Sequence, residues 1–437
     1  MDSCLSEMGC GKTLTAIAIA GRLFLDGKVK RLLVVAPTSV VSVWPKEFAE
    51  YAAFQHSCVP LEGDAKKRIK ALNETAPGLD VKVINYEATW RMIESLIAWS
   101  PDMIICDESQ RIKTASAKQS KAMHKLGDQA KYKLILTGTP VQNAPLDFWS
   151  QYRFLDKNIF GNSYYAFKTR HAVMGGYGNY QVLGYRDLGD LTRKAHSIAY
   201  RITKADALDL PPETDETRHT ELEPEAKRVY KQIARESYAE IESGEVTAAN
   251  ILTRLLRLSQ ITGGYLNTDE GRTHEVSRAK LSALEELLED VVLGEEKKLV
   301  IFARFVSEIA AIRKLIQSKG IQYAWIAGEI KMEDRGEMVR SFQEEPEIKV
   351  FIAQIQTAGL GITLTAADTA VFYSLDFNFA NYSQARARIH RIGQRSACTY
   401  IHLIAPGTVD EKIMEALASK EDMARRVVDD WRSYFKP

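Results

Sequence analysis

The residues from Gln384 to Gln394, QARARIHRIGQ in one-letter code, combine arginine and glutamine in a pattern that could bind phosphate. Gln384, Arg388 and Arg391 are spaced at i, i+4 and i+7, so on a helix they would lie on one face. Arginine stays protonated near neutral pH, and its planar set of N–H donors matches phosphate oxygens. We therefore expect this face to meet a polyphosphate, with a solvated basic helix as the ordinary alternative.

A glycine-rich turn near the start of the chain is the candidate for the phosphate site. Gly9 and Gly11 let backbone N–H groups turn toward an anion, and the start of the following helix adds its positive end. Lys12 can reach the terminal phosphates of a nucleotide, and Thr13 can hold Mg²⁺. The glycine that usually stands five residues before Gly11 is Ser6 in this chain. The pattern predicts a phosphate-binding loop, and a helix cap with an incidental lysine is the alternative.

Two acidic residues, Asp107 and Glu108, follow an apolar run that is predicted to be a strand. Ligands of open α/β sheets bind at the carboxyl ends of strands. An acid there can hold Mg²⁺, and a second acid can orient the water that attacks the γ-phosphate. We assign the metal to Asp107 and the water to Glu108, although such a pair taken alone is more often a solvated turn. The next predicted strand ends in Thr137, Gly138 and Thr139, where an element that senses the γ-phosphate would lie.

The elements that must position these residues repeat along the chain. Short β-rich apolar runs alternate with helical patterns twice, which is typical of parallel sheets covered by helices. The first set of predicted strands is Leu32–Ala36, Val81–Asn85, Met103–Cys106 and Leu134–Thr137, and the second is Leu299–Ala303, Gln322–Ile326, Val350–Ala353, Ala370–Ser374 and Tyr400–Ile404. The fold class is therefore α/β, with two doubly wound parallel-sheet lobes.

A region between the two sets of strands has a different pattern. From about Phe148 to Val276 the strand signal fades, and residues 225–258 have the pattern of one or two long amphipathic helices. We therefore predict three domains. They are a first lobe with the phosphate-loop candidate at 1–147, a helical insertion or bridging region at 148–276, and a second lobe at 277–437.

Composition limits the class of protein but does not name a partner. The 437 residues are 45% hydrophobic and 26% charged, as in soluble globular proteins. No apolar run approaches the roughly 20 residues that span a bilayer, and the first residues lack the apolar core of a signal peptide. We expect a cytoplasmic protein without a membrane partner, from a prokaryotic or viral-host cell rather than a nucleus. The five cysteines are scattered, which predicts neither zinc nor a disulfide framework.

Eight segments occur in an order that points to one family. In one-letter code they are MGCGKT, APTSVVSVWPKEF, VINYEAT, CDESQRIKT, LTGTPVQNAPLDFWS, KLVIFARF, TAGLGITLTAADTAVFYSLDFN and QARARIHRIGQ. This order resembles that of the Swi/Snf-like ATPases of helicase superfamily two, over nearly the whole chain. The resemblance implies two RecA-like lobes and a monomeric, DNA-stimulated ATPase that moves along double-stranded DNA. The protein partner is unknown.

The resemblance also implies roles for single residues, with ATP and Mg²⁺ as cofactors. Gln384 would orient Arg388 and Arg391, which would be arginine fingers supplied by the second lobe. Lys and Arg total 58 against 57 Asp and Glu, so any DNA contact must come from local placement. The implied residues are Gly9, Gly11, Lys12, Thr13 and Gly361 at the nucleotide, Thr13 and Asp107 at the metal, Glu108, Arg388, Arg391 and Gln384 in catalysis, and Thr38, Ser39, Trp44, Arg304 and Thr357 on the DNA backbone.

The chain departs from the family pattern in two places that bear on function. Ser109 and Gln110 stand where the family usually has alanine and histidine, so coupling would depend on an amide that cannot titrate near neutral pH. Eight residues precede Gly9, and the family's adenine-reading glutamine is not among them. We therefore expect hydrolysis to prefer ATP only weakly over GTP.

Two other functions compete with a duplex translocase. A strand-separating helicase acting on DNA or RNA would use the same ATPase residues, and a duplex-displacement assay would distinguish it. A non-hydrolysing nucleic-acid clamp would not need Lys12, Asp107, Glu108, Arg388 and Arg391 together. All five are present, which favours the motor.

Overall fold

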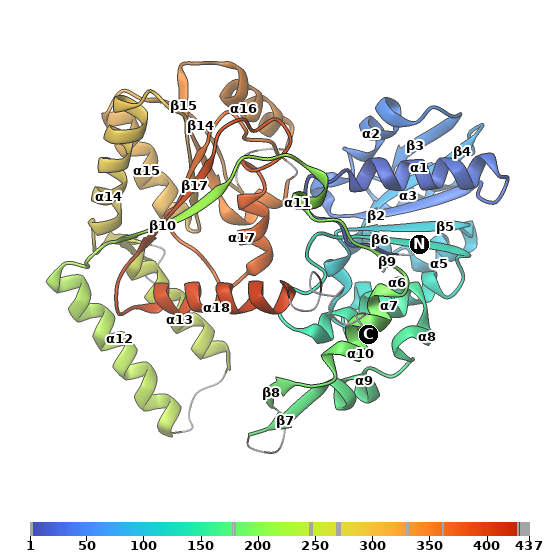
Figure 1. The fold of residues 1–437 in the computed structure, drawn as a ribbon, viewed down its shortest axis with the longest axis horizontal. Helices are drawn as coiled ribbons and strands as arrows, with labels where there is room; N and C mark the ends of the chain where they lie inside the picture. The colour runs from blue at the N-terminus through green and yellow to red at the C-terminus, as the bar shows by residue number, and fades with distance from the viewer. Residues whose placement is uncertain are drawn as a thin grey trace. The chain divides into compact units, whose positions relative to one another are not determined.

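Two parallel β-sheets form the framework of the chain in the computed structural model (Figure 1). The structure describes residues 3–176, 178, 181–243, 248–267, 272–328, 330, 332–360, 362–425 and 428. The chain divides into two units, the first Met1–Asp209 with Lys420–Pro437 and the second Leu210–Ser419. In the described part of the chain, no helix is both long and apolar enough to cross a membrane.

The sheet of the first unit has the order β3-β4-β2-β5-β6-β1-β9, and all its pairings are parallel. Its strands are β1 (Ser3–Cys4), β2 (Arg31–Ala36), β3 (His56–Pro60), β4 (Leu79–Asn85), β5 (Met103–Asp107), β6 (Tyr132–Leu136) and β9 (Ala199–Tyr200). The helices next to it are α1 (Lys12–Leu25), α2 (Trp44–Tyr51), α3 (Ala65–Asn73), α4 (Tyr86–Thr89), α5 (Ile93–Trp99), α6 (Lys118–Gly127) and α7 (Phe148–Leu155).

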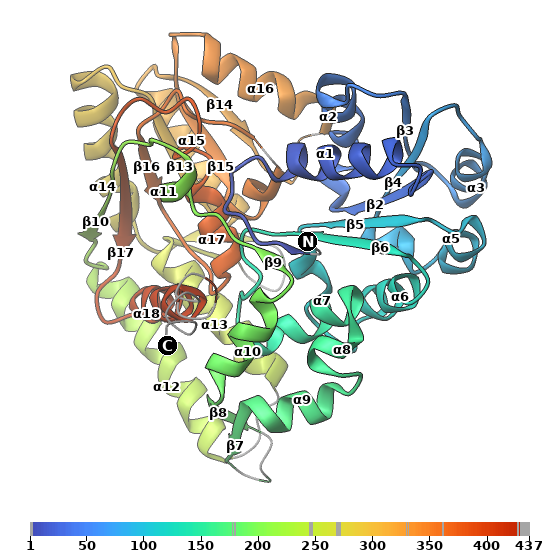
Figure 2. The ribbon, with the colours of Figure 1, turned by 45° about the vertical axis from the view of Figure 1, so that its right-hand side comes forward.

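Helices cover both faces of this sheet, because successive side chains of a strand point to opposite sides. In β2, Leu33 and Val35 pack in one hydrophobic cluster, while Leu32 and Val34 pack in another. The first cluster includes residues of α3, α5, α6 and α7, and the second includes residues of α1 and α2. Figure 2 shows α1 and α2 on one side of the strands and α6 and α7 on the other.

The first unit continues beyond α7 with smaller elements. They are α8 (Lys157–Phe160), α9 (Tyr164–His171), the hairpin of β7 (Ala172–Gly175) and β8 (Gln181–Tyr185), α10 (Leu188–His196) and α11 (Lys204–Ala207). Phe167 and Leu191 of this region are buried in the same cluster as residues of α6 and α7. This helical region is therefore part of the first unit's core.

The sheet of the second unit has the order β10-β17-β16-β13-β15-β14, again with parallel pairings throughout. Its strands are β10 (Glu213–His219), β13 (Leu299–Ala303), β14 (Gln322–Ile326), β15 (Ile348–Gln354), β16 (Thr369–Phe372) and β17 (Cys398–Ile404). The other elements are α12 (Pro224–Ser243), α13 (Ala248–Thr262), the hairpin of β11 (Tyr265–Asn267) and β12 (Thr273–Glu275), α14 (Ala279–Leu287), α15 (Val306–Ser318), α16 (Met332–Glu344), α17 (Phe379–Arg386) and α18 (Val409–Ala424).

This second sheet is also covered on both faces. Leu299 and Ile301 of β13 pack with residues of α14 and α15. On the opposite face, Phe372 of β16 lies 5.1 Å from the ring of Tyr382 in α17, and Phe342 of α16 lies 5.2 Å from Phe351 of β15. The predicted fold class, two doubly wound α/β lobes, is confirmed.

The predicted strands are all present, with ends that differ by one or two residues. The one or two long helices predicted within residues 225–258 are present as two, α12 and α13. The sequence prediction missed β1, β3, β9 and β10 of the two parallel sheets, and the two hairpins β7–β8 and β11–β12. β10 has the sequence ETDETRH, which carries no apolar alternation because it is a mostly exposed edge strand that pairs only with β17.

The predicted insertion at 148–276 is shared between the two units. Residues 148–209 group with the first sheet and residues 210–276 with the second. The domain limits at 147 and 276 mark where the strand patterns stop and restart, and as domain boundaries they stay a prediction.

Candidate functional site

The phosphate-loop candidate connects β1 to α1 in the first unit. Gly9 and Gly11 have left-handed backbone conformations, with φ of 90° and 70°, which glycine adopts without steric cost. The Lys12 ammonium donates to the backbone oxygens of Ser6 and Glu7, each at 3.0 Å. Lys12 and Thr13 form the first turn of α1, at the positive end of the helix. The loop therefore gathers backbone and side-chain donors in the place predicted for a phosphate.

A segment far along the chain supports this loop from the other side. The backbone N–H groups of Leu5 and Glu7 donate to the oxygens of Tyr200 and Ile202, at 2.8 and 3.0 Å. The Glu7 carboxylate also accepts from Arg201 at 3.2 Å. Sequence reasoning missed this support, because residues 198–204 lie inside the region that was predicted to be helical. A two-residue strand leaves no periodic signal to detect.

Asp107 ends β5 and is almost completely buried, with 9% of its surface exposed. Its carboxylate accepts from the indole N–H of Trp44 at 3.1 Å. Burial, followed by the neighbouring Glu108 carboxylate, raises the pKa of Asp107 to about 7, against the opposing effects of Trp44 and Lys12. Burial in turn lowers the pKa of Lys12, while Glu108 and Asp107 act in the other direction. The acid pair and the lysine are therefore close enough to interact electrostatically.

A chain of hydrogen bonds joins the acid pair to the strand end at Thr137. Gln110 donates to the Glu108 carboxylate at 2.6 Å and accepts from the Thr137 hydroxyl at 2.7 Å. The hydroxyl of Thr137 also accepts from the backbone N–H of Thr139 at 3.1 Å. Glu108 itself has φ 51°, a left-handed conformation that is uncommon for a residue with a side chain. Gln110 therefore lies between the acid pair and Thr137 and is hydrogen-bonded to both.

The same strand end approaches the phosphate-loop candidate closely. A Cβ added at Gly138 would lie 3.2 Å from Met8 Cγ and 3.3 Å from Met8 N. A Cβ there would be tight, and the neighbouring atoms would have to shift by a few tenths of an ångström to admit it. The three motifs of the first unit, the loop at Gly9–Thr13, the acid pair and the turn at Thr137–Thr139, are therefore brought together, as expected for strand ends of one sheet.

The predicted DNA contacts of the first unit lie in different environments. Thr38 is exposed, and its hydroxyl accepts from the Asn85 amide at 2.9 Å. Ser39 is half-buried beside it in the turn Thr38–Val40. Trp44 is 1% exposed and bonded to Asp107, so the structure does not place it at a surface, as a DNA contact would require. Its apolar ring packs in the core while its single N–H has a buried partner.

The predicted DNA contacts of the second unit lie at neighbouring strand ends. Arg304 follows β13 and is half-buried, and its backbone oxygen accepts from the Gln354 amide at 3.2 Å. Thr357 follows β15, and its hydroxyl donates to the backbone oxygen of Gln354 at 2.6 Å. Arg304 and Gln354 also line an open cavity of about 640 Å³. The structure therefore brings Arg304 and Thr357 together through Gln354.

The arginine motif does not form one continuous helical face, so that expectation is wrong. Gln384 lies on α17, which ends at Arg386, and the later residues form tight turns. The backbone N–H of Arg388 bonds three residues back to Ala385 at 3.1 Å, which breaks the helical spacing. Gln384 and Arg388 are each 8% exposed, and Arg391 is half-buried and donates to the oxygen of Ile362 at 3.3 Å.

Arg386, which the sequence prediction left out, has a structural environment in the second unit. Its guanidinium is paired with Asp215 and lies 3.5 Å from the Glu213 carboxylate, and it stacks 4.0 Å from the ring centre of Tyr400. The partners come from β10, the strand that sequence reasoning missed. Without β10 there was no signal that one arginine of the motif differs from the others.

The remaining site predictions concern glycine and metal. Gly361 lies outside the described residues. Within the described ranges, no group of three or more His, Cys, Asp and Glu side chains could hold a metal ion. The predicted pair of Thr13 and Asp107 offers only two protein oxygens, which is the sparse donor set that Mg²⁺ uses when substrate phosphates and waters complete its shell.

Comparison with known proteins gives this arrangement a family. The SNF2-related domain matches residues 4–263, which is more than half of the chain, and the helicase conserved C-terminal domain matches residues 279–393. The chain therefore belongs to the SNF2-related family, and the resemblance inferred from the motif order is confirmed.

Individual relatives are similar over almost the whole chain. The mouse protein "Chromodomain-helicase-DNA-binding protein 1-like" is 29% identical over 442 residues, covering 97% of this chain and 47% of that protein. The Bacillus subtilis "Putative ATP-dependent helicase/translocase YwqA" is 28% identical, covering 98% and 46%. The solved structure of the "Sulfolobus solfataricus SWI2/SNF2 ATPase core in complex with dsDNA" is 27% identical with a TM-score of 0.43, covering 100% and 90%. The chain spans less than half the length of these two curated relatives.

Proposed function

We propose that the chain is an ATP-hydrolysing motor that is stimulated by double-stranded DNA and moves along it. The observation that carries the proposal is the hydrogen-bonded line from Glu108 through Gln110 to Thr137, set beside Lys12 and Asp107. A structural turn does not need a buried acid, a half-buried lysine and an amide relay at one edge of a sheet. The names of the relatives, an ATP-dependent helicase or translocase and a DNA-binding helicase, agree with this function.

The residues of the first unit have distinct tasks in the proposed reaction. Gly9, Gly11 and Lys12 bind the phosphates of ATP, since the loop presents backbone N–H groups and an ammonium together. Glu108 orients the attacking water and accepts its proton. Its left-handed backbone and its bond from Gln110 fix the carboxylate in one direction. Gln110 then reports the state of the γ-phosphate to Thr137.

Mg²⁺ is the metal that the donors at this site favour. Thr13 and Asp107 offer a hydroxyl and a carboxylate, both hard oxygen ligands. Asp107 is buried with a raised pKa, so a nearby cation would favour its charged form. When bound, the ion would neutralise charge on the phosphates.

The second unit supplies positive charge that stabilises the transition state of hydrolysis. In this proposal Arg388 and Arg391 stabilise the transition state, and Gln384 orients them. An arginine finger contributes roughly 10³ to 10⁵ in rate. Arginine side chains keep their proton near neutral pH, so the effect of such a finger depends on where it is placed.

Duplex DNA is the proposed track, contacted through its backbone. Thr38 and Ser39 of the first unit and Arg304 and Thr357 of the second are the proposed contacts. Hydroxyl and arginine contacts to phosphate position a duplex without reading its sequence. Trp44 is not among them, and its proposed task is to hold Asp107 at the site through their hydrogen bond.

Steady-state ATP hydrolysis without nucleic acid, and with single-stranded DNA, duplex DNA and RNA, tests the function. We expect stimulation by duplex DNA above the other three conditions. Lys12→Ala should abolish it, because phosphate binding loses its ammonium. Lys28→Ala is the matched control, since Lys28 is an exposed lysine of the same unit that pairs with Asp26.

Two results would contradict the proposal. If the Lys12→Ala protein hydrolysed ATP at the wild-type rate, the assignment of the nucleotide site to the loop at Lys12 would be wrong. Stimulation by RNA or single-stranded DNA alone, with strand displacement, would favour the helicase alternative.

A further inference from the structure

Glu308 is a buried carboxyl group in the second unit that none of the proposed roles uses. It lies in the first turn of α15 and is 1% exposed. One oxygen, Oε2, accepts from the backbone N–H groups of Arg304 and Phe305 at 3.1 and 3.0 Å and from the Ser374 hydroxyl at 2.5 Å. The other oxygen, Oε1, has no hydrogen-bond partner among the described residues.

This environment exceeds what a helix cap requires. A capping glutamate needs only to accept from the N–H before the helix, and it does so while exposed to water. Burying a carboxylate with one oxygen unsatisfied is costly. A structure keeps such a group where several elements depend on its position, so the partners of Glu308 indicate what it does.

Those partners lead to both proposed DNA contacts of the second unit. The backbone N–H of Arg304 is shared between Glu308 and the Ser374 hydroxyl, the latter at 2.8 Å. The backbone oxygen of Arg304 accepts from Gln354, whose own backbone oxygen accepts from Thr357. Glu308 and Ser374 therefore hold the backbone of Arg304 directly, and Gln354 connects that backbone to the hydroxyl of Thr357.

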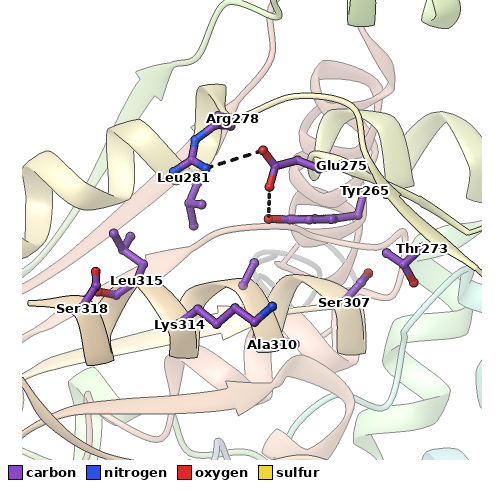
Figure 3. A pocket seen from close by; sticks show the side chains of 11 residues that line it. Tyr265, Thr273, Glu275, Arg278, Leu281, Ser307, Ala310, Lys314, Leu315 and Ser318 are labelled. Atoms are coloured by element: carbon purple, nitrogen blue, oxygen red, sulfur yellow. Dashed lines mark hydrogen bonds and ion pairs between the residues drawn. The ribbon is translucent and has the colours of Figure 1, made fainter.

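A surface groove lies beside the start of α15, next to this network. A cavity of about 500 Å³ lies between the β11–β12 hairpin and α15. Figure 3 shows Ser307 and Lys314 on α15 facing Glu275 and Arg278 across it. It shares Ser307, Thr273 and Ala310 with the cavity that Arg304 lines. Ser307 directly precedes Glu308, so the carboxyl group lies where α15 begins beneath this groove.

The other side of Glu308 is closed by the end of α13. A Cβ added at Gly263 would lie 1.9 Å from Glu308 Oε1, so the glycine gives the carboxyl group its space. The backbone oxygen of Gly263 accepts from the Tyr373 hydroxyl at 3.2 Å. Lys280 is the cationic neighbour whose charge favours the ionised carboxylate. The carboxyl group is thus held from both sides.

We propose that Glu308 is a positioning residue for DNA, which with Ser374 holds the backbone of Arg304 so that its guanidinium meets a duplex phosphate. The proposal rests on the proposed function, because it presumes that this unit contacts duplex DNA. It assigns Glu308 no contact with DNA and no part in hydrolysis. Its effect passes through Arg304.

The dependence of duplex affinity on salt tests this link with the full chain. Each phosphate neutralised by a cationic side chain makes the negative slope of log K against log salt concentration steeper by about 0.9, and the size of this slope is what the variants change. We expect Arg304→Ala to lower the slope by about 1. Glu308→Ala should lower it by a similar amount, and the double variant by no more than either single one, since both remove the same contact. Glu308→Gln keeps an acceptor oxygen and should keep the wild-type slope.

Control variants separate positioning from general damage. Glu289→Ala removes an exposed carboxylate of the same unit that pairs with Lys319, and it should leave the slope unchanged. Ser374→Ala serves if Glu308→Ala does not fold, because it removes one partner of the Arg304 N–H and should lower the slope less than Arg304→Ala. Loss of folded protein alone lowers the active fraction but not the slope.

Two outcomes overturn the inference. One is a wild-type slope in both Glu308→Ala and Ser374→Ala, and the other is a double variant whose slope falls by the sum of the single effects. Duplex stimulation of ATP hydrolysis by the wild-type chain, measured in the same preparations, tests the proposed function separately. A chain that is stimulated by duplex but keeps the wild-type slope in both Glu308→Ala and Ser374→Ala keeps the function and loses the inference.

Discussion

Asp107 in the first unit and Glu308 in the second are matched in one respect and opposite in another. Both are buried acids near the carboxyl ends of parallel strands, and burial raises the pKa of each to about 7. Asp107 stands beside a lysine and a second carboxylate, with an indole as its hydrogen-bond donor. Glu308 accepts instead from two backbone N–H groups and a serine hydroxyl.

The difference shows that a raised pKa alone does not identify a catalytic acid. Burial produces the same shift at both sites, but the partners decide what the group can do. In the proposed reaction a metal ion and the ammonium of Lys12 would be the partners of Asp107, and such exchangeable partners would allow chemistry there. Fixed backbone partners make Glu308 part of the scaffold. The two sites therefore predict opposite results for the same kind of substitution.

The largest expected difference in activity between the two sites comes from replacing each acid by its amide. Asp107→Asn should lower DNA-stimulated ATP hydrolysis by roughly 10²-fold or more, because a charge that acts at the phosphates is lost. Glu308→Gln should keep hydrolysis at saturating duplex near the wild-type rate, because the amide oxygen can still accept from the backbone. Steady-state hydrolysis at saturating ATP and duplex measures both.

The comparison breaks if the two variants behave alike. A Glu308→Gln protein as inactive as Asp107→Asn would place Glu308 in the chemistry. An Asp107→Asn protein that still hydrolysed ATP would show that the assignment of Asp107 as a metal ligand is wrong. Nucleotide binding by Asp107→Asn, measured separately, shows whether the loss lies in binding or in turnover.

The sequence predicted the parts of these sites that depend on local spacing. The strand ahead of Asp107 is a continuous apolar run, so both the strand and the position of the acid at its end could be found. Lys12 follows a glycine turn and begins a helix, a pattern that is also local. For the same reason the parallel sheets could be predicted from alternating strands and helices.

The parts that failed depend on tertiary partners. Trp44 shows no sign in sequence that its N–H would meet Asp107, 63 residues away. Glu308 looks like an ordinary helix-capping residue until Ser374 and Gly263 are placed around it. The helical face at Gln384 was wrong because the chain tightens after Arg386, where β10 supplies the partners. Long-range contacts of this kind leave no periodic pattern.

Alanine substitutions at two glycines extend the comparison to the free energy of unfolding. A Cβ at Gly263 would overlap Glu308 Oε1 at 1.9 Å, whereas a Cβ at Gly138 would lie 3.2 Å from the flexible side chain of Met8. Gly263→Ala should therefore lower the free energy of unfolding by about 1–3 kcal/mol, because a buried and hydrogen-bonded group must move. Gly138→Ala should cost less stability but reduce ATP turnover, since it displaces the phosphate loop.

Denaturant unfolding and steady-state hydrolysis of both alanine variants measure these effects. Gly184→Ala is a control, because nothing lies within 4 Å of a Cβ there. A Gly138→Ala protein that loses more stability than Gly263→Ala would reverse the assignment of scaffold and site.

The smallest effect expected is the pH dependence of stability at Glu308. Its pKa rises from the ordinary value of 4.5 to about 7 on folding, so the folded protein holds the proton more tightly than the unfolded chain. The stability that this group contributes is complete below pH 4.5 and is lost as pH rises through about 7.

Glutamine carries no such charge. The melting temperature of Glu308→Gln relative to wild type should therefore rise between pH 5 and pH 8, by about 2–4 °C for each kcal/mol recovered. A difference that stays constant over this range would mean that Glu308 is already ionised in the folded protein, with Lys280 as its effective partner.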